Sequence, residues 1–161
     1  MIVVSNTSPL IYLSKIKKLD LLLQLYKKVH IPPKVLEELL KEKDEVAYFK
    51  AFASSFIVEK ADEKMPDFQL HGGETEAINL ALNKKADIIL LDDHKARNAA
   101  KALGLNVKGT LGLLLTFLEK KLIGKNEFKA LVDDLIKADF RISIELYNEV
   151  LKKAENFNSN L

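Results

Sequence analysis

Five short apolar runs, separated by longer segments with helical spacing, constrain the fold of this chain more than any other feature. Continuous apolar runs are typical of strands buried on both faces, and their alternation with helices predicts a parallel sheet. We therefore expect an α/β fold with three layers, α/β/α, around a central parallel sheet, followed by C-terminal helices. The runs are Ile2–Ser5, Val29–Ile31, Phe56–Val58, Ile88–Leu91 and Asn106–Lys108.

Helical spacing fills most of the chain between and after these runs. The expected helices are Pro9 to about Tyr26, Pro32 to about Lys43, Glu45–Ala53, Glu74–Lys84, His94–Leu103, Thr110–Lys121, Asn126–Lys137 and Ser143–Lys153. We expect a loop around Met65-Pro66-Asp67 and a frayed polar tail over residues 156–160. The break at Gly124 is too short for a flexible linker, so we expect one domain, residues 1–161, with 110–155 as its helical C-terminal part.

Composition narrows the class of protein. The 161 residues include no cysteine, which excludes disulfides, thiolate metal sites and cysteine nucleophiles. No apolar stretch approaches the roughly 20 residues of a membrane span, and no secretory signal pattern is visible, so we expect a cytoplasmic protein without membrane contact. The net charge of +2 does not indicate nucleic-acid binding, but a local basic rim can still steer a polyanion. Abundant Lys and Glu without Cys or Trp are compatible with a thermophilic source.

The sequence lacks the common nucleotide-binding, serine hydrolase and zinc-binding motifs. It has no phosphate-binding loop ending in Gly-Lys-Ser/Thr, no dinucleotide fingerprint after the first strand and no Gly-x-Ser-x-Gly elbow. The three histidines are scattered and lack a zinc spacing. The chemistry must therefore come from another kind of site.

Polar residues follow two of the expected strands. Asn6 stands where the chain leaves the first strand, and Asp92-Asp93 directly follows the fourth. In an open α/β sheet, ligands and metals gather at the carboxyl ends of central strands. One of the two aspartates can cap the helix that begins near His94, which leaves the other unexplained.

Two glutamate pairs lie on expected helices. At about 100° per residue, Glu74 shares the apolar face of its helix, whereas Glu76 points to the opposite, solvent face together with Asn79. A carboxylate on an inward face needs a partner, because burying it alone is costly. In the helix after Pro32, Glu37 and Glu38 flank the apolar stripe about equally, so helical geometry does not choose between them.

Together these residues predict an acidic site at one edge of the sheet. Its members are Asn6, Glu37 or Glu38, Glu74, and Asp92 or Asp93. Oxygen ligands without His or Cys favour a hard cation, Mg²⁺ or Mn²⁺. The chemistry natural to such a cluster is metal-assisted phosphodiester hydrolysis.

Five short motifs occur in a fixed order over roughly the first 110 residues. They are Val4–Ile11 (VSNTSPLI), Ile31–Glu38 (IPPKVLEE), Gly73–Ile78 (GETEAI), Leu91–Arg97 (LDDHKAR) and Gly109–Gly112 (GTLG). In this order they resemble the PIN domain, a family of small metal-dependent nucleases that includes the toxins of many bacterial and archaeal toxin–antitoxin pairs. Each motif is short, but the five together form a specific signal.

The resemblance implies a set of site residues. The implied catalytic and metal-binding set is Asn6, Glu38, Glu74 and Asp92, with Asp93 as a further candidate ligand and as the expected helix cap. It selects Glu38 over Glu37 by the spacing from Val35, and it agrees with the helix-face argument for Glu74.

The residues after Asn6 are expected to support the site. Thr7 or Ser8 would hold the metal ligands by hydrogen bonding, and Ser8 also suits an N-cap before Pro9 at the first helical position. Lys95 and Arg97 are candidate contacts to an RNA backbone.

The function implied by the resemblance is a Mg²⁺- or Mn²⁺-dependent ribonuclease, toxin-like and homodimeric, with an antitoxin protein as a further partner. Asn6 departs from the family pattern, because an active PIN nuclease usually carries aspartate there. An amide oxygen brings no charge and should weaken binding of a divalent cation. The alternative is therefore a catalytically weak or inactive PIN-like domain that acts as a binding or regulatory partner.

Overall fold

The computed structural model describes residues 1–62 and 69–157. The chain divides into two compact units, Met1–Gly109 and Thr110–Leu161. The expected loop around Met65-Pro66-Asp67, and residues 158–160 of the expected tail, lie outside the described residues. That the whole chain forms a single domain stays a prediction.

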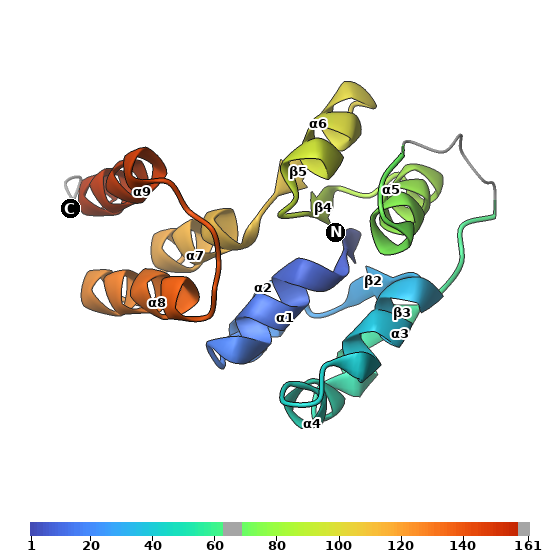
Figure 1. The fold of residues 1–161 in the computed structure, drawn as a ribbon, viewed down its shortest axis with the longest axis horizontal. Helices are drawn as coiled ribbons and strands as arrows, with labels where there is room; N and C mark the ends of the chain where they lie inside the picture. Colours follow the sequence, from blue (N-terminus) through green and yellow to red (C-terminus); the bar gives the residue numbers. More distant parts are fainter. Residues whose placement is uncertain (63–68, 158–161) are drawn as a thin grey trace. The chain divides into compact units, whose positions relative to one another are not determined.

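A five-stranded, all-parallel sheet forms the centre of the first unit (Figure 1). The strand order is β3-β2-β1-β4-β5. The strands are β1 (Val3–Ser5), β2 (Val29–Ile31), β3 (Phe56–Val58), β4 (Ile88–Leu90) and β5 (Val107–Lys108). The predicted parallel sheet is confirmed, and β2 and β3 have the predicted bounds.

Helices and one 3-10 turn connect these strands. They are α1 (Thr7–Lys15), α2 (Leu19–Tyr26), α3 (Pro33–Lys41), α4 (Val46–Lys50), η1 (Ala53–Ser55), α5 (Gly72–Lys84) and α6 (His94–Ala102).

The prediction of one helix from Pro9 to Tyr26 was wrong, because α1 and α2 are separated by a turn at Lys17. Lys17 has a left-handed φ of 57°. The N–H of Lys18 donates to Leu13 O at 2.8 Å and that of Lys17 donates to Ser14 O at 3.1 Å. This pattern satisfies the last carbonyls of α1 and ends the helix without a glycine.

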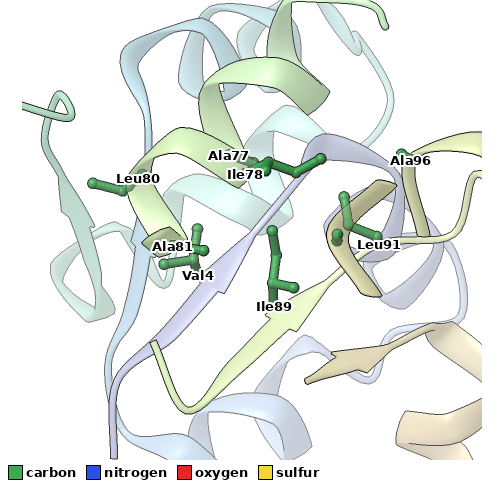
Figure 2. Packing of buried hydrophobic residues seen from close by; sticks show 9 residues of the cluster. Val4, Ala77, Ile78, Leu80, Ala81, Ile89, Leu91 and Ala96 are labelled. Atoms are coloured by element: carbon green, nitrogen blue, oxygen red, sulfur yellow. The ribbon is translucent and has the colours of Figure 1, made fainter. Parts of the chain in front are cut away.

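Both faces of the sheet are buried. On one face, Val4 and Ile89 pack with Ile78 and Ala81 of α5 and with Ala96 of α6 (Figure 2). Side chains alternate between the faces of a strand. The neighbours Val3, Leu90 and Ile31 therefore point to the other face, and they are also fully buried. The predicted three-layer α/β/α arrangement is confirmed.

The order of the strands defines where a ligand is expected. From β1 the chain moves outward to β2 and β3, and it then returns to add β4 and β5 on the other side of β1. The carboxyl ends of β1 and β4 therefore mark the point where the strand order reverses, the usual ligand position in open α/β sheets. Asn6 follows β1 there, and its N–H donates to Leu90 O at 3.0 Å.

The second unit consists of helices in the part that the structure describes. They are α7 (Thr110–Glu119), α8 (Lys125–Lys137) and α9 (Ile144–Asn156), which pack against one another (Figure 1). Phe117, Phe128 and Val150 are among their buried side chains. All three helices were predicted. In residues 1–62 and 69–157, no helix has the length and apolar character needed to cross a bilayer.

Candidate metal centre at the end of the first strand

A pocket of about 370 Å³ lies at this reversal point and brings together several of the predicted residues. We call it the acidic pocket. It is lined by Asn6, Thr7, Ser8, Glu38, Lys41, Glu42, His71, Gly73 and Glu74. The structure thus gathers residues from three segments that are far apart in the sequence, the start of α1, the second half of α3 and the start of α5.

Asn6 is buried at the wall of the acidic pocket, with 4% of its surface exposed. It is the N-cap residue of α1, but its side chain makes no capping hydrogen bond. Among the described residues, its Oδ1 atom has no hydrogen-bond partner. A buried acceptor without a partner is costly, so this oxygen is a candidate ligand for a cation or a water molecule.

The prediction that Ser8 caps the first helix was wrong. The helix begins at Thr7, because the chain enters it directly from the strand, and Asn6 takes the cap position with extended backbone angles. Ser8 instead lies inside the first turn, at the edge of the acidic pocket.

Thr7 holds Glu38 in the acidic pocket, and Gly73 leaves room for its carboxylate. Thr7 Oγ1 donates a hydrogen bond to Glu38 Oε2. A Cβ atom built on Gly73 would lie 2.8 Å from Glu38 Oε2 and 2.9 Å from Oε1, closer than real Cβ contacts. The glycine therefore allows the Glu38 carboxylate to lie against the first turn of α5.

The neighbouring glutamate has a different environment. Glu37 is exposed, and its Oε1 lies 3.4 Å from Lys34 Nζ and 3.2 Å from Lys41 Nζ. These two lysines lower the pKa of Glu37. The structure thus places Glu38 in the acidic pocket and Glu37 in a surface ion-pair cluster, a difference that the helical pattern alone left open.

Glu74 is the second carboxylate of the acidic pocket and is 8% exposed. Its Oε2 accepts a hydrogen bond from the His71 N–H at 3.3 Å, across the first turn of α5. Burial raises the pKa of Glu74, and the negative charges of Asp93 and Glu38 raise it further. The site therefore concentrates negative charge that a cation would neutralise.

Asp93 and Asp92 lie after β4 and do not line the acidic pocket. Asp93 Oδ1 accepts from the Ala96 N–H at 2.8 Å, which confirms its predicted role as the cap of α6. Asp93 is nevertheless close enough for its charge to raise the pKa of Glu74. Asp92 Oδ1 instead approaches Gly109, where a Cβ atom would lie 3.0 Å from it.

The two basic residues predicted to contact RNA make hydrogen bonds to backbone carbonyls. Lys95 Nζ donates to Gln69 O at 2.9 Å, and Arg97 Nη1 donates to Leu91 O at 3.0 Å. Their contact with RNA stays a prediction.

The donor atoms of the acidic pocket fit a hard divalent cation. In residues 1–62 and 69–157, no three His, Cys, Asp or Glu side chains come together as a metal-holding group. The pocket instead offers the carboxylates of Glu38 and Glu74 together with the amide oxygen of Asn6. Mg²⁺ commonly binds proteins through one or two carboxylates and keeps several waters, so this oxygen-only set suits Mg²⁺ or Mn²⁺.

Two features of the molecule were missed by sequence reasoning. The prediction that Asn79 faces solvent was wrong, because α3 packs against α5 and leaves Asn79 only 7% exposed. The close approach of Gly73 and Glu38 joins residues 35 positions apart, so little in the local sequence indicates it. A glycine pair inside the first turn of a helix, where alanine is the better helix former, was the one available hint.

Comparison with known proteins points to one family. The model of the DUF3368 family, described as a PIN domain, matches residues 2–156. No curated protein and no solved structure is significantly similar to the chain.

Proposed function

We propose that this chain, which belongs to the PIN domain family, is a metal-dependent nuclease that hydrolyses phosphodiester bonds in RNA. One observation carries the proposal. The buried Asn6 Oδ1, which lacks a partner among the described residues, lines the same pocket as the Glu38 and Glu74 carboxylates. An oxygen-only site at the reversal point of a parallel sheet is the setting in which divalent-metal hydrolysis is expected.

In this proposal Glu38, Glu74 and Asn6 hold Mg²⁺ or Mn²⁺. A divalent cation held there would supply charge neutralisation at the phosphodiester and would lower the pKa of a water nucleophile. Thr7 keeps Glu38 in place through its hydroxyl, and the His71 N–H keeps Glu74 in place. The raised pKa of Glu74 supports this assignment, because burial first, and then the charges of Asp93 and Glu38, disfavour the ionised carboxylate that a bound cation would stabilise.

The family resemblance adds further residues to the proposed site. It makes Asp92 a catalytic residue and a metal ligand, with Asp93 as the other candidate ligand. Lys41 lines the acidic pocket and is a candidate contact for the substrate phosphate. Lys95 and Arg97 are proposed to contact the RNA backbone beyond it.

A cleavage assay with matched variants tests this function. Purified protein is incubated with single-stranded RNA and Mn²⁺, and products are resolved on a sequencing gel. Glu38→Gln removes the charge of one proposed ligand and should lower the cleavage rate about 100-fold, because binding and activation by the metal depend on the ligand charge. Glu149→Gln makes the same change at an exposed glutamate of α9 that does not line the acidic pocket and should cleave like the wild type. Equal cleavage rates for the two variants would contradict the proposal that the acidic pocket is the catalytic site.

Asn6 supports a second candidate function. A neutral ligand at a position where aspartate is usual would leave a catalytically weak or inactive domain that acts as a binding or regulatory partner. Wild-type protein that binds single-stranded RNA but releases no products in Mn²⁺ would favour this function over the nuclease.

The family suggests two protein partners, an antitoxin and a second copy of this chain. We also propose that the protein acts in the cytoplasm. Sedimentation of the purified chain tests the dimer, because a mass of 18.2 kDa would identify a monomer.

A further inference from the structure

A second pocket, of about 670 Å³, lies on the other side of the first turn of α5. Gly73 lines the acidic pocket, and the preceding residue, Gly72, lines the second pocket. The N-terminal turn of α3 forms another wall, and the segment after β3 contributes Lys60 and Ala61. A strand of RNA with one phosphate in the acidic pocket would therefore pass close to the second pocket.

Two buried polar atoms in the second pocket have no partner among the described residues. They are Thr75 Oγ1 and Asn79 Oδ1, which stand one helical turn apart on α5. Asn79 is 7% exposed, so bulk water does not readily solvate its amide. Buried acceptors are nearly always hydrogen-bonded in native proteins. The helix does not need Asn79 for its own stability either, since asparagine is a weak helix former. These two atoms are therefore candidate hydrogen-bond partners for a ligand in the second pocket.

The remaining walls restrict the chemistry of that ligand. Pro33 and Leu70 present apolar surface, and Lys60 lines the pocket without an ion-pair partner in the described parts of the chain. The pocket thus combines an apolar wall, hydrogen-bonding atoms on α5 and the ammonium groups of Lys34 and Lys60. It also includes the carboxylates of Glu37 and Glu76, which accept hydrogen bonds from Lys34. A nucleobase has apolar faces and a polar edge, and it is joined to a phosphate.

We propose that the second pocket binds one base of the RNA strand whose phosphodiester lies in the acidic pocket. Asn79 Oδ1 accepts a hydrogen bond from an N–H on the polar edge of the base, and Thr75 Oγ1 pairs with a neighbouring polar atom. Lys60 contacts the phosphate of the same nucleotide. The proposal rests on RNA being the substrate, as inferred above.

Binding without cleavage tests this site separately from the nuclease activity. The affinity of the protein for a fluorescent hexaribonucleotide is measured in EDTA by anisotropy, and it is compared with that for an abasic ribose-phosphate hexamer. We expect the wild type to bind the base-bearing RNA about tenfold more tightly, a difference in the range of base recognition. Equal affinities would overturn the base site, whereas the nuclease proposal would still stand or fall on the cleavage assay.

Variants then locate the recognition. Asn79→Leu should reduce the tenfold preference to about twofold or less and leave affinity for the abasic hexamer unchanged. Thr75→Val, which keeps the shape of the side chain, should reduce the preference by a smaller factor. Asn98→Leu makes the same change as Asn79→Leu on the exposed surface of α6 and should leave the preference intact.

A structural role for Asn79 predicts a different result. If folded Asn79→Leu and Thr75→Val proteins both keep the full preference for base-bearing RNA, and only their melting temperatures change, the proposal is wrong. Lys60→Gln provides a further check, because a phosphate contact should weaken binding of both hexamers equally and reduce the dependence of affinity on salt.

Discussion

The close approach of Gly73 and Glu38 gives a specific prediction. Adding one methyl group at Gly73 should weaken metal binding without lowering the stability of the fold. In Gly73→Ala, the new Cβ would lie 2.8 Å from Glu38 Oε2. That oxygen must move by about 0.6 Å or more to reach an ordinary contact distance. The carboxylate is the end of a flexible side chain, so it can swing out of the acidic pocket and lose its hydrogen bond from Thr7.

The substitution should have opposite effects on stability and on function. Alanine is a better helix former than glycine, so the free energy of unfolding should rise or stay within about 0.5 kcal/mol of the wild type. Displacing one of two carboxylates should lower Mn²⁺ affinity by a factor of about 10 to 100, the range seen when the support of a metal ligand is removed. Calorimetric titration with Mn²⁺ and thermal unfolding without metal measure the two quantities.

Gly72→Ala is the matched control. Its Cβ would meet only Lys34, with Cε at 3.6 Å and Cγ at 3.8 Å, which are ordinary contacts. We expect a similar effect on stability and an unchanged Mn²⁺ affinity. The reasoning would be refuted if Gly73→Ala bound Mn²⁺ as tightly as Gly72→Ala does.

Four further predictions follow from the charges in the first unit. The folded state raises the pKa of Glu74, so the contribution of this residue to the free energy of unfolding favours folding at low pH and is lost as the pH rises through that pKa. Urea titrations of the metal-free protein should show this loss of stability. The Glu74→Gln variant should not show it. Mn²⁺ affinity, measured by calorimetry, should rise over the same pH range, since the metal requires the ionised carboxylate. Asn6→Asp should bind Mn²⁺ about tenfold more tightly than the wild type, because a charged oxygen replaces a neutral one; unchanged affinity would show that this side chain is not a ligand. Burial raises the pKa of Glu59, but hydrogen bonds from Lys84 and His30 outweigh it and lower the pKa overall. Glu59→Gln should therefore cost about 1 kcal/mol at neutral pH, with the difference fading in acid, as measured by chemical unfolding.

Much of the fold could be predicted because local patterns agree with the final packing. The runs Val29–Ile31 and Phe56–Val58 became strands with those bounds, since apolar runs of this length are buried in a parallel sheet. Asp93 was correctly predicted as the cap of α6, because capping depends on residues within one turn.

The errors arose where distant contacts decide the outcome. The turn at Lys17 contains neither glycine nor proline, so nothing in the local sequence marks the left-handed residue that ends α1. Asn79 lies on the side of α5 that faces away from the sheet, as helical spacing predicts. The prediction of solvent exposure failed because α3 packs against α5 and Asn79 is buried. The second pocket was missed for the same reason.

The acidic pocket was predicted in part. Asn6, Glu38 and Glu74 line it, and all three were predicted site residues. Helical geometry alone did not choose Glu38, because the choice depends on Thr7 and Gly73, which approach from two other segments. The roles of Asp92 and Asp93 as ligands stay predictions.

The central claim, that the acidic pocket binds a divalent cation, is tested most directly by paramagnetic broadening. Mn²⁺ is added in small steps, well below one equivalent, to uniformly ¹⁵N-labelled protein, and the amide signals are followed by NMR. The account predicts that the signals of Asn6, Thr7, Glu38 and Glu74 broaden first, and that Mg²⁺ added in excess restores them. Broadening that begins elsewhere, such as at the exposed cluster around Glu37, would contradict the account.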